Sequence, residues 1–148
     1  MSREQEKMER LRRLIVELRL MEGSAEILQR RLEFLQAALS DLRMAENSLR
    51  ELRGRGEGSP ILVPVGGNTF IGARLGDLSK VIVGIGADVS VEMSLDEAVE
   101  DISSRIDEVE KAGTSVQQQL EQIMAQIQSH REMINELTSQ LQGERRGV

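Results

Sequence analysis

The sequence contains no cysteine, tryptophan or tyrosine among its 148 residues, and only two phenylalanines, two prolines and one histidine. The absence of cysteine excludes disulfide bonds and thiol chemistry, and it fits a reducing compartment. Aromatic rings supply much of the buried area of an ordinary globular core, so their near absence argues against such a core. Charged residues make up 30% of the chain, and with abundant Leu, Glu, Arg, Gln and Ala this is typical of long helices and coiled coils.

Membrane, secreted and nucleic-acid-binding proteins need features that this sequence lacks. No apolar run comes near the roughly 20 residues that span a bilayer. The opening segment, MSREQEKMERLRRL, is charged throughout and has no apolar core of the kind found in signal peptides. The formal net charge of -6 disfavours contact with nucleic-acid phosphates. We expect a soluble, cytoplasmic protein with no membrane and no nucleic-acid partner.

The stretch from Ser59 to Met93 is the one part of the chain without a helical pattern. It contains both prolines, and Gly66-Gly67-Asn68 and Gly86-Ala87-Asp88 are tight-turn signals. The strand-like runs around these turns are residues 61–65, 69–75, 80–85 and 89–93. The sequence therefore predicts two β-hairpins in series.

These hairpins have apolar residues on both faces, since Ile61 and Val63 point away from Leu62. An isolated hairpin is marginal in water, and its open edges invite pairing. We predict that the hairpins join other copies or related chains in a shared sheet or barrel. The alternative is a small sheet folded back on the ends of the helices. The predicted oligomerisation residues are Ile61, Val63, Val65, Phe70, Ile71, Val81, Ile82, Val83, Ile85, Val89 and Val91.

A heptad pattern precedes the hairpins. Apolar residues alternate at spacings of three and four from Leu11 to Leu42, which predicts a coiled-coil helix over 8–53 and a glycine-rich linker over 54–60. A second apolar set lies away from this seam and is called here the outer stripe: Val16, Leu20, Ile27 and Phe34. It is either scattered surface residues or a surface that contacts another molecule.

A second heptad helix is predicted over 94–142. Ser94 and Glu97 fit a capping box at its start, and the three-four spacing runs without a slip from Leu95 to Leu141. Gly113 and His130 keep this spacing, but they are the two seam positions without an apolar side chain. Gly113 either makes room for a bulky neighbour or allows bending. We interpret His130 as a tolerated polar seam residue, because no cysteine or second histidine could complete a metal site with it.

The two helices match in length, so the hairpins at 61–93 would place them side by side and antiparallel. The predicted fold class is mainly α with small β: one structural unit, a two-helix antiparallel coiled coil joined by two β-hairpins. At the far tip there are more apolar side chains than the seam needs. They either bind exposed apolar segments of other proteins or simply cap the seam. The predicted tip residues are Met8, Leu11, Leu14, Ile15, Leu18, Met133, Ile134, Leu137 and Leu141.

No motif for catalysis or cofactor binding emerges. The segment Gly84-Ile85-Gly86 lacks the third glycine of a dinucleotide loop, since Val89 stands in that place, and no helix is predicted after it. There is no nucleophile–base pair and no metal cluster. We expect a binding protein without cofactor or enzymatic activity.

The order of elements is unusual: a heptad helix, two hairpins and a second heptad helix of equal length. In this order the chain resembles the archaeal-type prefoldin alpha subunit over essentially its whole length. The second hairpin is what resembles the alpha rather than the beta subunit. Asp88 departs from the family pattern, where glycine is frequent. The residues that carry the resemblance are Leu62-Val63-Pro64-Val65, Gly66, Gly67, Phe70, Val81-Ile82-Val83-Gly84-Ile85-Gly86 and Val91-Glu92.

The resemblance implies a hexameric chaperone of two alpha and four beta subunits whose hairpins build a β-barrel platform. Its coiled-coil tips would hold unfolded client proteins, without ATP, for transfer to a group II chaperonin. The outer stripe would then line the cavity between the coiled coils. The alternative function is a static coiled-coil scaffold or tether without chaperone activity.

Overall fold

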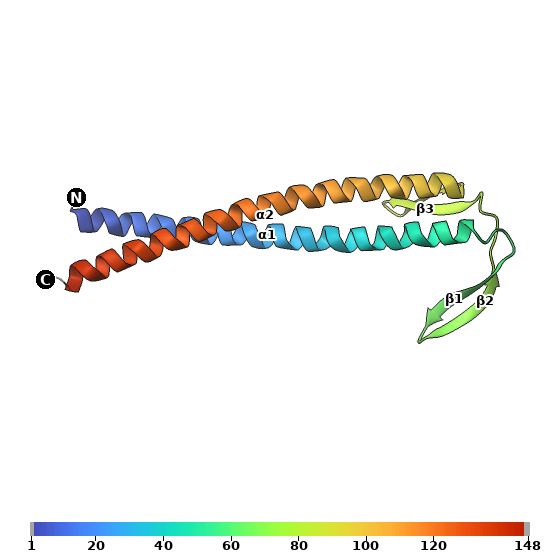
Figure 1. Cartoon of the computed structure of the whole chain (residues 1–148), viewed down its shortest axis with the longest axis horizontal. Coiled ribbons are helices and arrows are strands. Elements are labelled where there is room, and N and C mark those ends of the chain that lie inside the picture. The colour runs from blue at the N-terminus through green and yellow to red at the C-terminus, as the bar shows by residue number, and fades with distance from the viewer. Residues whose placement is uncertain (1, 147–148) are drawn as a thin grey trace. The chain divides into compact units, whose positions relative to one another are not determined.

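The computed structural model describes residues 2–146. The elements are, in chain order, α1 (Arg3–Arg53), β1 (Pro60–Gly66), β2 (Thr69–Arg74), β3 (Val81–Gly86), β4 (Val89–Met93) and α2 (Leu95–Arg146) (Figure 1). Two long helices are thus separated by two antiparallel hairpins, β1–β2 (hairpin 1) and β3–β4 (hairpin 2). This confirms the fold class that the sequence predicts.

Both helices extend beyond the ends that the sequence predicts. α1 begins at Arg3 instead of residue 8, because Ser2 and Gln5 form a reciprocal capping box. The backbone N–H of Gln5 donates to Ser2 Oγ and that of Ser2 donates to Gln5 Oε1, both at 3.2 Å. α2 continues through Gly143 to Arg146 instead of ending near residue 142, since one glycine weakens a helix by about 1 kcal/mol without ending it.

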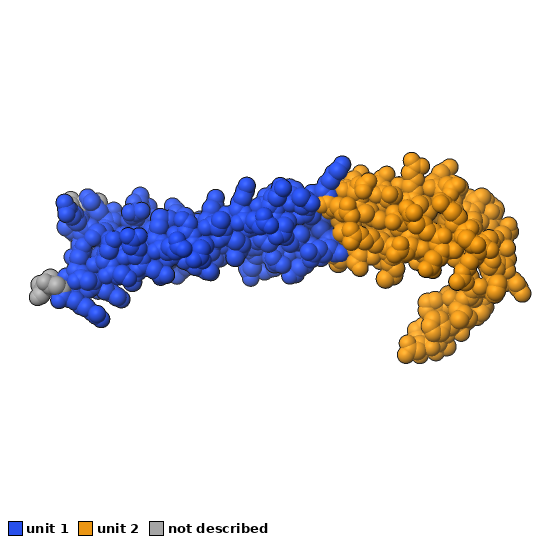
Figure 2. Space-filling view, viewed as in Figure 1, with its two compact units in different colours: residues 1–36, 111–148 blue, residues 37–110 orange. Residues whose placement is uncertain are grey.

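Contacts divide the chain into two compact units, residues 1–36 with 111–148 (unit 1) and residues 37–110 (unit 2) (Figure 2). The matched heptad helices predict a single structural unit. A residue in a two-helix seam contacts only its near neighbours on the two helices. Contacts in such a seam are local, and they do not gather around one centre.

In unit 1, α1 and α2 run antiparallel. Lys7 pairs with Glu144, and Arg131 Nη2 lies 3.4 Å from Glu22 Oε1. Early residues of α1 therefore oppose late residues of α2, as the matched heptads predict. The ion pairs lie at the surface, where such pairs contribute roughly 0–1 kcal/mol each, so they report the register more than they stabilise it.

The core of unit 1 is the apolar seam between the two helices. Every predicted seam position is buried or half-buried, and Ile127 has the lowest exposure among the buried residues of this unit, at 2%. No aromatic side chain takes part, because Phe34 lies on the outer stripe and is exposed. The buried residues of this seam are Leu14, Ala25, Leu32, Val116, Ile127, Leu137 and Leu141.

Gly113 occupies a helical, half-buried seam position in unit 1. A Cβ atom placed there would meet no atom within 4 Å, so the glycine is not needed to make room for a bulky neighbour. We expect Gly113→Ala to raise the free energy of unfolding by about 1 kcal/mol, the usual cost of glycine in a helix interior. Denaturant unfolding followed by far-UV circular dichroism measures this change. A lowered stability would contradict the expectation and indicate that the backbone at residue 113 requires glycine.

Hairpins 1 and 2 form two separate two-stranded sheets in unit 2. Their turns have the same geometry, because backbone φ is positive at Gly67 (55°) and Asn68 (57°) and likewise at Ala87 (51°) and Asp88 (59°). Two consecutive positive φ angles are typical of the type I′ turn, whose twist matches that of the strands. Asp88 stands where glycine is frequent in the resembling family, and the second turn still has the same geometry as the first.

Hairpin 2 packs on the first turns of α2, where Figure 1 shows β3 beside the helix. Arg105 Nη1 donates to the carbonyl oxygen of Gly84 at 2.9 Å. Ala98 lies one heptad earlier on the same side of α2, off the seam, and is 0% exposed. Val83 of β3 is also buried, at 7%. Hairpin 2 is therefore folded back on the end of a helix, the alternative to a shared sheet that the sequence left open.

The segment between the two hairpins is held by short-range polar contacts. The backbone N–H of Ser79 donates to Asp77 Oδ1 at 2.9 Å. This bond first, then the Ser79 hydroxyl and the charge of Lys80, hold the pKa of Asp77 below its usual value. Whatever stability the Asp77 carboxylate contributes is therefore present at neutral pH and is lost as the pH falls through its folded-state pKa.

Candidate interaction surfaces

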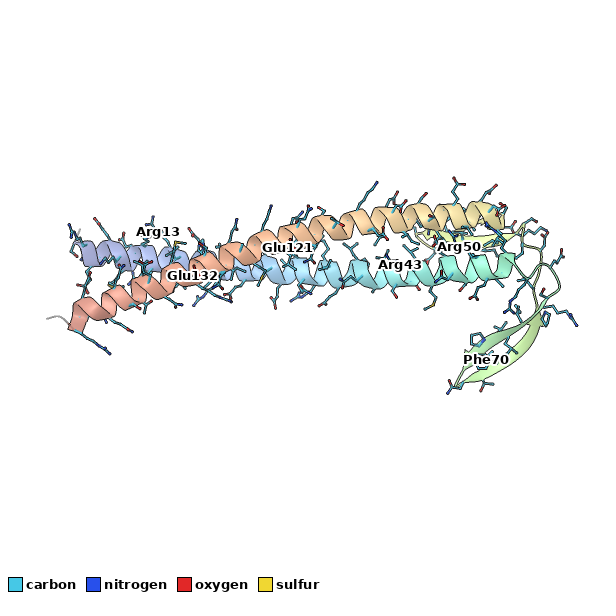
Figure 3. The ribbon with its side chains drawn as sticks, viewed as in Figure 1. Arg13, Arg43, Arg50, Phe70, Glu121 and Glu132 are labelled. Carbon is cyan, nitrogen blue, oxygen red and sulfur yellow. The ribbon has the colours of Figure 1, made fainter. Side chains whose placement is uncertain are left out.

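Hairpin 1 exposes apolar side chains on both of its faces. In the strand register, Val63 lies opposite Ile71 on one face. The neighbouring pairs, Leu62 with Gly72 and Pro64 with Phe70, bring their side chains to the other face. Figure 3 shows Phe70 on this hairpin. Leu62 is 71% exposed, and it is absent from the oligomerisation residues predicted above, although the strand alternation had placed it opposite Ile61 and Val63.

The predicted oligomerisation residues differ in exposure. Val83 is buried within the chain, while Ile61 and Val81 are half-buried. Those that are exposed are Val63, Val65, Phe70, Ile71, Ile82, Ile85, Val89 and Val91. The structure thus leaves most of the predicted surface uncovered, with four exposed residues on each hairpin. Only hairpin 2 packs on a helix, so hairpin 1 is uncovered on both faces.

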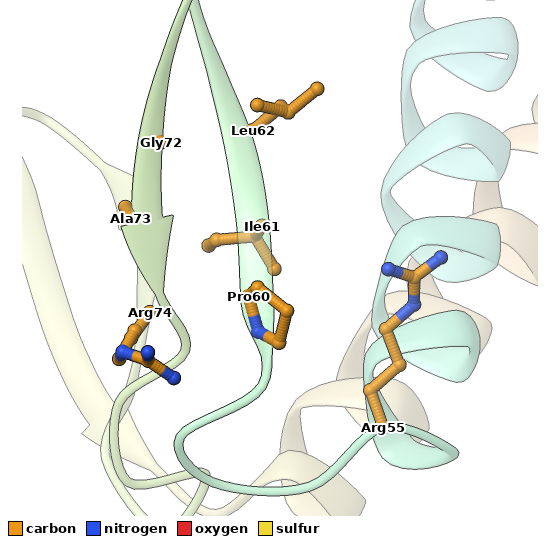
Figure 4. Close-up of a pocket in the computed structure, with 7 residues that line it drawn as sticks. All are labelled: Arg55, Pro60, Ile61, Leu62, Gly72, Ala73 and Arg74. Carbon is orange, nitrogen blue, oxygen red and sulfur yellow. The ribbon is translucent and has the colours of Figure 1, made fainter.

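An open groove of about 670 Å³ separates hairpin 1 from Arg55, which follows α1 (Figure 4). Leu62 and Pro60 lie on its hairpin side, where Gly72 adds no side chain. Arg74 Nη1 donates to the carbonyl oxygen of Gly58 at 3.2 Å, which holds the base of the hairpin. The groove leaves the face that carries Leu62 accessible.

The nine predicted tip residues are less exposed than the sequence suggests. Leu14, Leu137 and Leu141 are buried, and the other six are half-buried. Four of the nine line an open groove of about 260 Å³ at the end of unit 1 where α1 begins and α2 ends. This tip groove is lined by Met8, Leu11, Ile15 and Leu141, with Arg12, Thr138, Gln142 and Arg145.

The outer stripe is the most exposed apolar surface on α1 in unit 1. Leu20 and Phe34 are 68% and 73% exposed, and Val16 and Ile27 are also exposed. Leu20, Ile27 and Phe34 lie one heptad apart, on the side of the helix that points away from the partner helix of the seam. The sequence predicts this stripe, and all four side chains are exposed in the structure.

His130 is a polar seam residue, as the sequence predicts. Its Nε2 lies 2.8 Å from Glu17 Oε2 and its Nδ1 lies 3.1 Å from the carbonyl oxygen of Gln126. Among residues 2–146, no three His, Cys, Asp or Glu side chains are grouped as a metal site would require. Within the same residues, neither helix has the length and apolar character needed to cross a membrane.

Comparisons with known proteins agree with this architecture. The family model described as "Prefoldin subunit" matches residues 21–140. The prefoldin subunit alpha of Methanopyrus kandleri is 36% identical over 117 residues, which cover 79% of this chain and 74% of that protein. The prefoldin subunit alpha of Pyrococcus horikoshii is 30% identical over 118 residues, covering 79% and 80% of the two chains.

One relative and one solved structure extend these matches. A putative prefoldin subunit alpha of Aquifex aeolicus is 32% identical over 124 residues, covering 84% of this chain and 81% of that one. The cryo-EM structure of filamentous PFD from Methanocaldococcus jannaschii matches with a TM-score of 0.64 and 27% identity, over 76% of this chain and 93% of that chain. Two long helices joined by paired hairpins, a family model over most of the chain and these relatives together establish that the chain belongs to the prefoldin family, in the group of its alpha subunits.

Proposed function

We propose that this chain is a subunit of an ATP-independent holdase chaperone. It assembles with a second alpha subunit and four prefoldin beta subunits into a hetero-hexamer in the cytoplasm. The observation that carries this proposal is hairpin 1, whose two apolar faces are uncovered and whose strand edges are open. A lone hairpin of this kind is marginal in water, and a barrel shared between subunits would cover both faces and pair the edges.

The hexamer brings several coiled-coil tips to one client at the same time. The tip groove offers each client segment a small apolar contact, and the outer stripe offers a second contact within the cavity between the coiled coils. Each contact is weak, but linked sites convert later binding events into intramolecular ones, so total affinity rises without a strong single site. Release then needs no ATP, and the client passes to a group II chaperonin.

Reconstitution with the beta subunit from the same source tests this proposal. We expect a complex with the mass of the hetero-hexamer that suppresses aggregation of several unrelated unfolded proteins without ATP. Removal of residues 1–20 and 130–148 should preserve the hexamer, because hairpins 1 and 2 remain, and should abolish protection. A hexamer that protects no unfolded protein would instead support the static scaffold or tether, which binds one fixed partner.

The outer stripe is tested separately by the double variant Leu20→Glu and Ile27→Glu. Both side chains are exposed, so we expect the helices to remain folded and the hexamer to form. Client capture should weaken about tenfold if the stripe contributes one of the linked contacts. The measurement is the concentration of hexamer that halves aggregation of an unfolded model protein. Unchanged protection would remove the stripe from the client-binding surface.

A further inference from the structure

The tip groove combines an apolar floor with positive charge at its rim. Leu11, Ile15 and Leu141 are apolar lining residues contributed by both helices, and Met8 adds a flexible side chain that adapts to different shapes. Its volume of about 260 Å³ is below the roughly 300–1,000 Å³ of pockets for drug-sized ligands. The groove therefore suits a side chain of another protein better than a cofactor.

Two arginines line this groove, one from each helix. Arg12 and Arg145 are exposed, and neither makes an ion pair with another side chain of residues 2–146. Among residues 2–146, no carboxylate lines the groove. The neighbouring acid Glu144 pairs with Lys7. Guanidinium groups bind carboxylates with two parallel hydrogen bonds, which gives the groove a preference in charge as well as in polarity.

We propose that the tip groove selects client segments in which an apolar residue is flanked by Asp or Glu. The apolar side chain enters the groove, and Arg12 and Arg145 bind the flanking carboxylates. This inference rests on the proposed function, because it names the class of segment that the chaperone tips would hold. It also explains why a tip whose apolar residues are mostly within the seam still offers a contact: the arginines supply attraction that the small apolar area alone does not.

Binding of short labelled peptides to the reconstituted hexamer tests the selection. The first peptide is unstructured and carries a Leu-Ile pair with glutamates on both sides, and the second has glutamine in place of each glutamate. We expect the wild-type hexamer to bind the glutamate peptide about five- to tenfold more tightly, because two exposed charge pairs add a modest attraction. Raised salt should remove most of this difference.

The double variant Arg12→Gln and Arg145→Gln should reduce the preference to within about twofold, because binding of the glutamate peptide is weakened. The matched control is Arg13→Gln with Arg146→Gln, which removes the same charge at the same end of the helices from positions that do not line the groove; Figure 3 labels Arg13 there. The control should keep the full preference.

Equal wild-type affinities for the two peptides, or a preference that survives Arg12→Gln with Arg145→Gln, would overturn this inference and leave the holdase proposal standing. A hexamer that binds neither peptide, and also fails to protect unfolded proteins, would overturn both. The variant Arg12→Lys with Arg145→Lys distinguishes charge from geometry, because lysine keeps the charge without the paired hydrogen bonds. It should retain only part of the preference.

Discussion

Replacing Leu62 and Ile71 together by glutamate is expected to abolish assembly of the hexamer while the chain remains folded. Leu62 and Ile71 lie on opposite faces of hairpin 1 and both are exposed. In a shared barrel each face would be covered, so the two glutamates would be buried without a partner charge. Burial of an unpaired charge is strongly destabilising. We expect subunit association to weaken at least about 100-fold, which corresponds to about 2.7 kcal/mol, and native mass measurement should show a separated chain.

The fold should survive this change, because neither side chain contributes to the buried core. Circular dichroism of the separated chain should give the helix content of the wild type. The matched control is Leu20→Glu with Ile27→Glu, which makes the same change of chemistry at exposed positions of α1. That control should assemble normally. A hexamer of normal mass from the hairpin variant would indicate that hairpin 1 is not the assembly surface.

Replacing Ile127 by aspartate is expected to unfold the helix pair of unit 1. Ile127 is 2% exposed in the seam, where a carboxylate would have no partner and little access to water. Loss of the apolar side chain alone, as in Ile127→Ala, costs roughly 2–5 kcal/mol in well-packed cores, and the buried charge adds to this. The total stability of a domain is only about 5–15 kcal/mol. The cost of this one substitution is therefore a large share of the free energy that holds the helix pair together.

Hydrogen exchange measures this effect by segment. Backbone amides of residues 111–146 and 3–36 should lose protection, while those of hairpin 2 and the first turns of α2 should keep it, because their buried residues belong to unit 2. Met124→Asp is the matched control, since Met124 precedes Ile127 by one helical turn and is 48% exposed. It should change stability by less than about 0.5 kcal/mol. Equal protection in both variants would show that the seam tolerates a charge at residue 127.

Only part of the candidate surfaces could be predicted. The outer stripe follows directly from the positions of Val16, Leu20, Ile27 and Phe34 in the heptad, because a coiled coil fixes which side of a helix faces its partner. The tip groove did not follow, since Arg12 and Arg145 are far apart in the sequence and lie near each other only through the register of α1 and α2. The heptad pattern identifies the apolar residues at the tip, but it does not show which arginines lie beside them.

The amino-acid pattern by itself determined the helices, their antiparallel pairing and the existence of both hairpins, because heptad spacing and turn residues act locally and repeat over many residues. Tertiary structure decided which surfaces remain open. Val83 of hairpin 2 is 7% exposed, whereas Val63, at the equivalent place in hairpin 1, is 41% exposed. The two hairpins have similar strands and turns, so the difference arises from the packing of hairpin 2 on α2, where the folded chain brings Arg105 to the carbonyl oxygen of Gly84 and buries Ala98.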